Sequence, residues 1–386
     1  MKVLMIAPTP FFSDRGCHVQ IYEEIKTLQK KSIEIVLCTY GIGRDVPGIS
    51  TVRCFRMPWH QKLSAGASFI KILILPFLTV TVIQTILRFK PDIIHAHLHE
   101  GAVIARFCRI FFRKTKYLFD MQGSLTGELL QHDFIREHGF WHKFFSFLER
   151  RISKWFFVIT QSESMIKELE SLGVPPERRK NVYDGVDTDV FYPRPFPAIL
   201  AESFGINQTR PRVLYMGLLE PYQGADLMFQ AFRAVVAKVP QTQFIVIGYP
   251  NIEKYKALCA QYGITDCVKF LGRVDYALLP EYLALSEIAV APKIAATEGD
   301  GKIYNYMAMG MTTVAFDRPV SREILAECGI FSVMENAQSL AEGILQAIEN
   351  PSLRKKVGEG ARQRAVEYLS WGTVGQRIYE VYQQLS

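Results

Sequence analysis

The sequence predicts an α/β protein made of two doubly wound domains, in which helices cover both faces of a parallel sheet. Short apolar runs rich in Val, Ile and Leu alternate with longer amphipathic segments, as expected for buried parallel strands separated by helices. This alternation stops at a proline-rich stretch, residues 192–200, and then starts again. The restart predicts a second domain.

The first half of the chain contains five predicted strands, each followed by a segment long enough for a helix. They are residues 3–7 (VLMIA), 33–39 (IEIVLCT), 92–97 (DIIHAH), 116–121 (KYLFDM) and 155–160 (WFFVIT). Strands joined by helical crossovers pair in parallel. Residues 1–192 are therefore predicted to form the first Rossmann-like domain.

The second half repeats the pattern. Its predicted strands are residues 212–217 (RVLYMG), 243–248 (QFIVIG), 268–272 (VKFLG), 287–292 (EIAVAP) and 312–316 (TTVAF). Several of these strands end in glycine, which lets the backbone approach a ligand closely. Residues 200–369 are predicted to form a second Rossmann-like domain that faces the first across a ligand-binding cleft.

The composition is that of a folded globular protein, with 49% hydrophobic and 22% charged residues. The seven cysteines are scattered and form no CxxC pair, which argues against a disulfide framework and against a thiolate metal site. The apolar run at the amino terminus is short and is broken by Pro8, which argues against a signal peptide. A cytoplasmic location is expected.

The basic charge lies in the first half of the chain. Residues 1–190 hold 26 Lys and Arg against 19 Asp and Glu, whereas residues 191–386 hold 19 of each kind. An anionic partner such as a glycan or a lipid surface would therefore be attracted to the first domain. A basic surface that contacts only solvent would give the same distribution of charge.

Three segments resemble helices that meet a membrane. Residues 63–88 are long and apolar, but Lys71 and Pro76 interrupt them and a strand follows closely, which favours a buried or membrane-surface helix over a span. Residues 108–116 and 140–157 mix aromatic and basic side chains as interfacial helices do. Helices with basic ends that pack on a sheet would look the same. Peripheral contact with the inner face of the membrane is thus an alternative to a purely cytoplasmic location.

Residues 291–310 (APKIAATEGDGKIYNYMAMG) run from a strand through a glycine-rich turn into a helix and carry Lys293, Glu298, Asp300 and Lys302. Lysines, backbone N–H groups and a helix N-terminus stabilise the charge that a nucleoside diphosphate gains when it leaves a sugar. Glu298 could accept hydrogen bonds from sugar hydroxyls. Because any loop can carry such residues, the stretch indicates a site only in context.

That context comes from six segments taken together in their order and spacing. They are residues 8–28 (PTPFFSDRGCHVQIYEEIKTL), 91–98 (PDIIHAHL), 184–193 (DGVDTDVFYP), 215–232 (YMGLLEPYQGADLMFQAF), 268–293 (VKFLGRVDYALLPEYLALSEIAVAPK) and 301–316 (GKIYNYMAMGMTTVAF). Over essentially its full length, the chain resembles glycosyltransferase family 4, whose members are retaining enzymes of the GT-B fold. Residues 370–385 look like the terminal GT-B helix that crosses back onto the first domain.

The resemblance implies roles for individual positions. The loop at residues 13–16 would meet the diphosphate or the acceptor, Arg273 and Val274 would lie beside the nucleobase, and Glu298 would hold the donor sugar. The implied donor-binding positions are Gly16, Gly217, Gln223, Arg273, Val274, Gly299, Asp300, Gly301 and Asn305. The implied catalytic positions are Gln122, Lys293, Glu298 and Lys302, and the acceptor-side positions are Arg15, His97 and Asp120.

Four positions depart from the family pattern. The basic residue and the lysine that usually bind the diphosphate are replaced by Leu218 and Gln223. The usual ribose-binding glutamate aligns with Asn305, and the usual first-domain histidine aligns with Gln122. The Asn305 amide can still donate and accept hydrogen bonds, so ribose recognition would be weakened rather than abolished.

Lys293 and Lys302 offer two cations on a neighbouring loop. We therefore expect them to replace the missing basic pair, and a branch of the family with a YQG element has basic residues at both positions. The same departures are also compatible with a catalytically silent protein.

Two alternating sets of polar side chains follow strands: His95, His97 and His99, and Asp120, Gln122 and Ser124. The histidines could converge on a metal or line the acceptor site. The second set could contact the acceptor or stabilise a turn. The DTD triplet at residues 187–189 resembles a metal-binding motif, but it lies inside one of the family segments. No metal and no other cofactor is expected.

The expected function is that of a metal-independent, retaining hexosyltransferase. It would move a sugar from a nucleoside diphosphate, with a UDP-sugar as the expected donor, to a growing glycan or a lipid-linked saccharide, as in exopolysaccharide or cell-surface polysaccharide biosynthesis. No nucleic-acid partner is expected. Two alternatives stay open: a UDP-sugar epimerase or hydrolase of the same fold, and a silent sugar-nucleotide-binding partner of another transferase.

Overall fold

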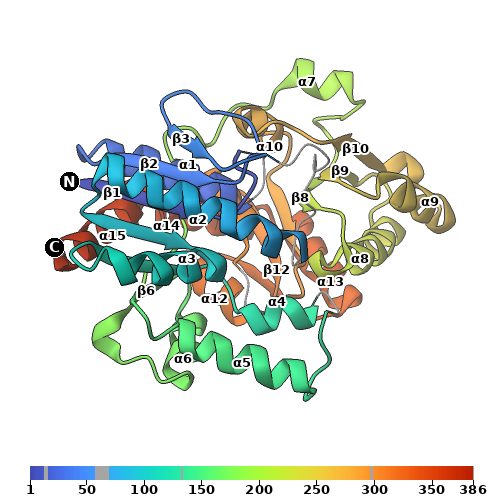
Figure 1. Ribbon diagram of the computed structural model, residues 1–386. Coiled ribbons are helices and arrows are strands. Elements are labelled where there is room, and N and C mark those ends of the chain that lie inside the picture. Colours follow the sequence, from blue (N-terminus) through green and yellow to red (C-terminus); the bar gives the residue numbers. More distant parts are fainter. Residues whose placement is uncertain (13–15, 57–68, 132–133, 296–298, 386) are drawn as a thin grey trace. The chain divides into compact units, whose positions relative to one another are not determined.

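The chain folds into two α/β units, each with its own parallel sheet (Figure 1). The computed structural model describes residues 1–12, 16–56, 69–131, 134–295 and 299–385. Unit 1 comprises mainly Met1–Asp184 and Trp371–Ser386, and unit 2 comprises mainly Gly185–Ala296 and Asp300–Ser370. The predicted fold class of two doubly wound domains is therefore confirmed.

Unit 1 is built on a seven-stranded sheet of order β3-β2-β1-β4-β5-β6-β7, in which every described pair is parallel. The strands are β1 (Lys2–Ala7), β2 (Glu34–Thr39), β3 (Ser50–Arg53), β4 (Ile93–His97), β5 (Lys116–Met121), β6 (Phe157–Thr160) and β7 (Arg179–Asn181). All five predicted strands are present. The two that the sequence analysis missed, β3 and β7, form the edges.

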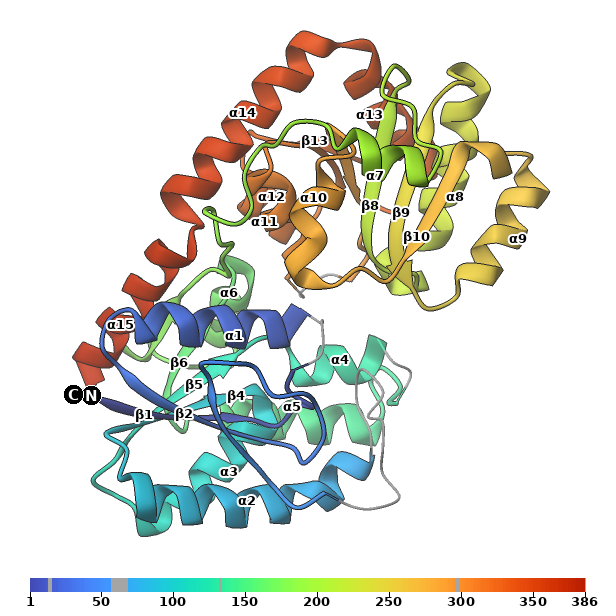
Figure 2. The same ribbon diagram turned by 90° about the horizontal axis from the view of Figure 1, so that it is seen from above.

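Helices cover both faces of this sheet (Figure 2). They are α1 (Gly16–Gln29), α2 (Phe69–Phe89), α3 (Leu98–Phe111), α4 (Leu125–Gln131), α5 (Phe140–Ile152), α6 (Glu163–Ser171), the 3-10 turn η1 (Pro176–Arg178) and α15 (Trp371–Leu385). Side chains of α1 and α15 share one core cluster with the sheet, and side chains of α2, α3 and α5 share the other. The sheet is therefore buried on both faces, as its apolar strands require.

Unit 2 is built on a six-stranded parallel sheet of order β10-β9-β8-β11-β12-β13. Its strands are β8 (Arg212–Leu218), β9 (Gln243–Tyr249), β10 (Val268–Gly272), β11 (Ile288–Ala291), β12 (Thr312–Phe316) and β13 (Ile330–Ser332). Its helices and 3-10 turns are α7 (Ala198–Ser203), η2 (Pro221–Gln223), α8 (Ala225–Lys238), α9 (Ile252–Tyr262), η3 (Thr265–Cys267), η4 (Tyr276–Leu278), α10 (Leu279–Leu283), α11 (Gly301–Ala308), α12 (Pro319–Leu325), α13 (Ala337–Glu349) and α14 (Pro351–Tyr368). Only the edge strand β13 lies outside the predicted set.

The boundary between the units falls at residue 184, earlier than the predicted boundary at residue 192. Residues 185–192 belong to unit 2 because they are bound to its last helix. Arg362 on α14 donates hydrogen bonds to the backbone oxygens of Phe191 (2.7 Å) and Thr188 (3.1 Å). The backbone N–H of Val186 donates to the oxygen of Leu369 (2.9 Å).

The segment expected to be a membrane-surface or buried helix forms α2, which contains Pro76. Its side chains Ile74, Leu78, Val82 and Ile86 belong to the core of unit 1. Among the helices that the structure describes, none is both long and apolar enough to cross a membrane.

The last helix, α15, packs on α1 within unit 1. Trp371, Val374, Ile378 and Val381 of α15 are buried in the same core cluster as Ile21 and Ile25 of α1. The two helices approach closely at Gly375, where an added Cβ atom would lie 2.1 Å from Cγ2 of Thr27. A glycine is therefore required at this crossing.

Each sheet has one point at which the strand order reverses, between β1 and β4 in unit 1 and between β8 and β11 in unit 2. In open parallel sheets, ligands bind at the carboxyl ends of the strands beside such a point. The predicted stretch 291–310 begins at the carboxyl end of β11, so the fold places it where a ligand is expected.

We expect Gly375→Ala to lower the free energy of unfolding by about 1–3 kcal/mol, because the added methyl group forces α15 away from α1. In a helix, alanine is intrinsically more favourable than glycine by about 1 kcal/mol. A loss of stability in Gly375→Ala would therefore report the steric clash and not helix propensity. Differential scanning calorimetry measures the change.

Gly360→Ala in α14 is the matched control, because its added Cβ would meet only the end of the Cys328 side chain, at 3.1 Å from Sγ. The control should be neutral or slightly stabilising. Equal effects of the two substitutions would contradict the close packing of α15 on α1.

Candidate functional site

The site in unit 2 is built around a tight turn that follows β8. The turn η2 ends at Gly224, which has a φ angle of +75° and lies so close to Pro292 that an added Cβ atom would sit 1.8 Å from its carbonyl oxygen. The backbone N–H of Ile294 donates to the oxygen of Tyr222 (3.1 Å). These contacts fix the loop that carries Lys293 against the turn that carries Gln223.

Gly217, near the end of β8, allows a second close approach. Its φ angle is +151°, and an added Cβ atom would lie 3.0 Å from both Cε of Lys302 and the hydroxyl oxygen of Tyr215. The long side chain of Lys302 therefore passes directly over the backbone of β8. Gly217 and Lys302, both predicted to bind the donor, are neighbours in the structure.

Lys302 lies in the first turn of α11, and its ammonium group is buried among polar partners. Nζ donates to Oε1 of Gln223 (2.8 Å), lies 3.2 Å from Oδ1 of Asp300 and lies 5.1 Å from the centre of the Tyr215 ring. The residue that takes the place of the usual family lysine, Gln223, thus holds the ammonium group of a lysine from another element. The structure thus brings Lys302 and Gln223 together, and the replacement of the missing cation by Lys302 stays a prediction.

Three cations act on the buried carboxylate of Asp300. Burial alone would raise the pKa of Asp300, but the charges of Lys302, Lys293 and Arg318 outweigh it and leave the pKa below its ordinary value. Nη1 of Arg318 lies 4.0 Å from Oδ2 of Asp300. All four side chains are at least nine-tenths buried. We call Lys293, Asp300, Lys302 and Arg318 the cation cluster.

The pKa of Lys302 is lowered, chiefly because burial disfavours its charged form and also because Lys293 and Arg318 repel it. The charge of Asp300 acts in the opposite direction. A second anion at this place would favour the charged form of Lys302 further. The cluster therefore has the electrostatic character of an anion site, with the N-terminus of α11 beside it.

Arg318 was not among the predicted site residues. It lies two residues after the end of β12 and directly before the first residue of α12, so it stands at the same carboxyl edge of the sheet as Lys293. The available signal was a basic residue two positions after a buried apolar strand.

The other predicted donor positions are placed as follows. Arg273 is exposed after β10, with its guanidinium 5.6 Å from the centre of the Tyr249 ring, and Val274 follows it half-buried. Asn305 is half-buried on α11, and Gly301 is the first residue of that helix. Gly299 precedes Asp300, Gly16 begins α1, and the predicted Glu298 and Arg15 lie outside the described residues.

In unit 1, three predicted side chains meet at the carboxyl ends of β4 and β5. Nδ1 of His97 lies 2.9 Å from Oδ2 of Asp120, and Nε2 of Gln122 donates to the same oxygen (2.9 Å). His97 and Asp120 are almost fully buried, whereas Gln122 is half-buried. His97 and Asp120 were expected to face the acceptor. Instead they lie buried behind Gln122, and Asp120 accepts a hydrogen bond from it. Gln122 is the most exposed of the three side chains.

Several expected groupings do not form. His99 lies on α3, away from His95 and His97, with Nε2 3.6 Å from Oε1 of Glu149. Ser124 also contacts Glu149 (3.2 Å) and accepts from the backbone of α4, so it has a structural role there. Asp187 accepts from the backbone N–H groups two and three positions later, which stabilises a turn.

A buried acidic residue, Glu24 of α1, lies beside the stacked rings of His95 and His97. Nδ1 of His95 lies 3.1 Å from Oε1 of Glu24 and 2.8 Å from the hydroxyl oxygen of Tyr382. Burial raises the pKa of Glu24 to about 8, with His97 opposing this effect and Asp120 adding to it. Burial lowers the pKa of His95 to about 4, with Asp120 opposing. Both groups are therefore uncharged near neutral pH.

The same residues could also hold a metal ion. One ligand atom from each of Glu24, His95 and His97 lies within 4.8 Å of the others, and Nε2 of both rings has no hydrogen-bond partner among the described residues. Imidazole and carboxylate groups are ligands that Zn²⁺ accepts. An ion would require ionised Glu24, whereas burial favours protonated Glu24 and neutral His95.

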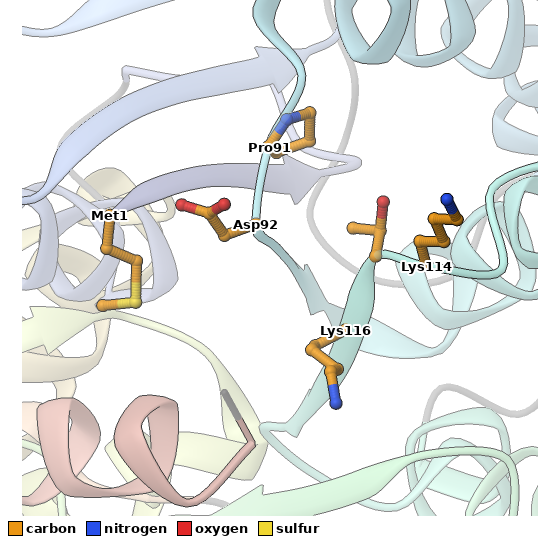
Figure 3. A pocket seen from close by; sticks show the side chains of 6 residues that line it. Met1, Pro91, Asp92, Lys114 and Lys116 are labelled. Atoms are coloured by element: carbon orange, nitrogen blue, oxygen red, sulfur yellow. The ribbon is translucent and has the colours of Figure 1, made fainter.

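A surface hollow lies at the opposite edge of the unit 1 sheet (Figure 3). Met1, Pro91, Asp92, Lys114, Thr115 and Lys116 line it. These residues stand at the amino ends of β1, β4 and β5, and the Asp92 carboxylate accepts from the backbone N–H of Lys2 (2.7 Å). Parallel sheets bind ligands at the other edge, so this hollow is not the functional site.

Two family models match the chain, one in each half. The model described as Glycosyltransferase Family 4 matches residues 15–190, and the model described as Glycosyl transferases group 1 matches residues 198–364. Between them they leave only residues 1–14, 191–197 and 365–386 unmatched.

Curated relatives resemble part of the chain. A phosphatidyl-myo-inositol mannosyltransferase of Mycobacterium tuberculosis is 25% identical over 226 residues, which cover 57% of this chain and 57% of the relative. A GDP-mannose-dependent alpha-(1-6)-phosphatidylinositol monomannoside mannosyltransferase of Mycolicibacterium smegmatis is 24% identical over 54% of this chain and 56% of the relative. The match thus spans little more than half the length of these relatives.

Solved structures share the fold over the whole chain. Sucrose-phosphate synthase from Thermosynechococcus elongatus has a TM-score of 0.83 at 17% identity and covers 100% of this chain and 98% of that one. Anabaena HepE, in a complex with UDP, has a TM-score of 0.79 at 18% identity and covers all of both chains. At these identities the likeness establishes the fold alone.

We expect the free energy of unfolding to fall between pH 6.5 and 8 because the pKa of Glu24 is raised in the folded protein. The folded pKa of Glu24, about 8, lies above its ordinary value of 4.5, so its contribution is complete below pH 4.5 and is lost as the pH rises through 8. The lowered pKa of His95 acts oppositely, but only between about 4 and 6.5. Above pH 6.5 the Glu24 effect stands alone within this pair and reaches up to about 2 kcal/mol.

Thermal unfolding of wild type and of Glu24→Gln across this range measures the effect. Glutamine cannot ionise, so the variant should lose less stability than wild type between pH 6.5 and 8. Parallel curves for the two proteins, or a wild-type melting temperature that rises with Zn²⁺ and falls with a chelator, would show instead that Glu24 is ionised in the folded state.

Proposed function

Because this chain belongs to the family 4 glycosyltransferases of the GT-B fold, we propose that it transfers a sugar from a nucleoside diphosphate donor to a glycan or a lipid-linked saccharide. The observation that carries this proposal is the cation cluster at the carboxyl edge of the unit 2 sheet. It gathers Lys293, Lys302 and Arg318 around one carboxylate at the point where the strand order reverses. A diphosphate is the anion that such a site fits.

The cluster gives the donor site a catalytic role as well as a binding role. When the bond between the anomeric carbon and the donor phosphate breaks, both electrons stay with the leaving diphosphate. Buried cations in fixed positions stabilise that charge more strongly than water does. Lys302 suits this role because Gln223 and Asp300 hold its ammonium group in place.

We propose a retaining reaction, as the family resemblance implies. The acceptor hydroxyl would attack the face of the sugar that the diphosphate leaves, and its proton would pass to the departing phosphate oxygen. Lys293 and Lys302 would bind the departing diphosphate. Their charges would neutralise it, so no metal ion would be needed. On the acceptor side, Gln122 at the end of β5 is the half-buried polar group that Asp120 orients.

The identity of the donor base is an open part of the proposal. The sequence favours a UDP-sugar, and the HepE structure is a complex with UDP, whereas the mycolicibacterial relative is named for GDP-mannose. The relatives' names also describe phosphatidylinositol acceptors, which supports a lipid-linked acceptor for this chain. The epimerase and hydrolase alternatives gain no support from these relatives.

Lys302→Met is expected to weaken nucleotide binding about 10- to 100-fold, because it removes a charged contact to the diphosphate and keeps the side-chain volume. The melting temperature of wild type is then measured with UDP, GDP, UDP-glucose and GDP-mannose in turn. We expect it to rise only with the ligands that carry one of the two bases, uracil or guanine. At a ligand concentration 100 times the Kd, the stabilisation is about 2.7 kcal/mol.

Lys256→Met is the matched control, since Lys256 is an exposed lysine of the same unit that pairs with Glu253. The control should respond to nucleotides as wild type does. An unchanged response in Lys302→Met would show that the cation cluster does not bind the diphosphate.

Turnover separates transfer from the alternatives. With the selected sugar nucleotide and a lipid extract as acceptor, we expect a glycosylated lipid whose anomeric configuration, read by NMR, matches the donor's. Release of nucleotide without a glycosylated product would support hydrolysis or epimerisation. Tight nucleotide binding without turnover on any acceptor would support the silent-partner alternative, which Leu218, Gln223 and Asn305 motivate.

A further inference from the structure

An apolar surface covers the outward faces of three helices in unit 1. Among the described residues, 22 large hydrophobic side chains are exposed, and 12 of them belong to α2, α3 and α5. They are Leu73, Phe77, Val80 and Leu87 on α2, Val103, Phe107, Ile110 and Phe111 on α3, and Phe140, Trp141, Phe144 and Phe147 on α5. We call these 12 residues the apolar face. Single exposed hydrophobic residues are ordinary, but 12 of them on three neighbouring helices indicate an interaction site.

The spacing of the residues shows that the exposed side of α2 is mostly apolar, with Gln84 as a polar position between Val80 and Leu87. On α2, Leu73, Phe77, Val80 and Leu87 follow one another at intervals of four, three and seven residues and are exposed. The opposite side of α2 is buried against the sheet. A helix that is apolar all round belongs in a protein core or in contact with lipid. The exposed side of α2 carries four large apolar side chains, which would be favourably buried against an apolar partner.

The aromatic residues of α3 and α5 continue the same surface. The rings of Phe107 and Phe111 lie 5.6 Å apart, and Trp141 lies 5.4 Å from Phe140 and 5.9 Å from Phe144, each measured between ring centres. Trp141 and Phe140 are 58% and 75% exposed, so the largest side chains of α5 point into solvent.

The three helices are neighbours on one side of the sheet. α3 contacts both α2 and α5, and side chains from all three enter the same core cluster. Figure 1 shows α2 and α3 side by side in front of the unit 1 strands. The exposed residues therefore lie on three helices that pack side by side over the same face of the sheet.

Cations accompany the apolar face. Basic residues on or directly after the three helices include Arg88, Arg106, Arg109, Arg113, Lys114, Lys143, Arg150 and Arg151. The acidic residues of these helices are only Glu100 and Glu149. Glu149 is buried and accepts hydrogen bonds from the start of α4, so it does not offset the exposed positive charge.

We propose that the apolar face of α2, α3 and α5 docks on a bilayer that contains anionic lipids. The aromatic side chains enter the boundary between head groups and acyl chains, and the neighbouring Arg and Lys side chains contact lipid phosphates. Charge complementarity selects this partner. A second copy of the chain would bring two positively charged faces together, which is unfavourable.

This inference does not rest on the proposed transfer reaction, because the apolar face and the cation cluster share no residue and lie in different units. Lipid binding can therefore be measured with the full chain in the absence of nucleotide. Its failure would leave nucleotide binding and turnover as they are.

The test is co-sedimentation of the full chain with vesicles of phosphatidylcholine alone and of phosphatidylcholine mixed with phosphatidylglycerol. Wild type should bind the mixed vesicles at least about tenfold more tightly than the neutral ones, since each cation near an anionic surface contributes about a fivefold gain. Binding should weaken as the salt concentration rises. Trp141 fluorescence should shift to shorter wavelength on binding, and Trp141→Phe should remove most of that shift.

The triple variant Phe111→Ser, Phe140→Ser and Trp141→Ser should lose at least about tenfold in affinity for the mixed vesicles, because three large side chains can no longer enter the bilayer. These residues are well exposed, so the variant should melt as wild type does. Ile199→Ser with Val333→Ser in unit 2 is the matched control, with side chains 88% and 62% exposed, and it should bind as wild type does.

Variants of the cations test the second half of the proposal. Arg113→Gln with Lys114→Gln should weaken binding to the mixed vesicles by about 25-fold and leave binding to neutral vesicles unchanged. Equal wild-type binding to both vesicle types, or no binding to either, would overturn the proposal. So would a dimer in solution that the triple Ser variant converts to a monomer, because a second copy of the chain would then cover the face.

Discussion

In unit 2, four charged side chains are buried together, and the surrounding structure must compensate for the cost of removing them from water. Three cations and one carboxylate are enclosed at the carboxyl edge of a parallel sheet, where each charge alone would be costly to remove from water. Asp300 offsets part of that cost, and the Gln223 amide provides a hydrogen-bond acceptor for Lys302. The glycines at 217 and 224 follow from this constraint, since one makes room for the Lys302 side chain and the other brings the Gln223 turn against the Lys293 loop.

The sequence predicted the central strands of both sheets because those strands are buried on both faces and read as continuous apolar runs. It failed at β3, β7 and β13, which are edge strands of three or four residues. The residues of β3 and β7 are half-buried at best, so no apolar run marks them. Such strands form because a neighbouring strand offers backbone partners, and that information lies in the tertiary structure.

The candidate site shows the same division between local and tertiary information. Lys293, Asp300 and Lys302 lie within ten residues of one another, so their spacing alone indicated a shared site. Arg318 joins them only because β11 and β12 are adjacent in the sheet, a pairing that the sequence does not state. His97 and Asp120 were correctly placed at a strand end, but alternation along a strand could not show that α1 and α15 bury that face of the sheet.

Net charge was a poor guide to where buried cations gather. Residues 191–386 carry equal numbers of acidic and basic residues, yet this half contains the cation cluster. A diphosphate responds to charges within a few ångströms in a buried site, where screening is weak, so three enclosed cations matter more than the sum over a domain. Many cations of the first half are exposed, including Arg88 on α2 and those on α3 and α5, and solvent screens each of these charges. Such a distribution suits an extended anionic surface, because many weak contacts can then act together.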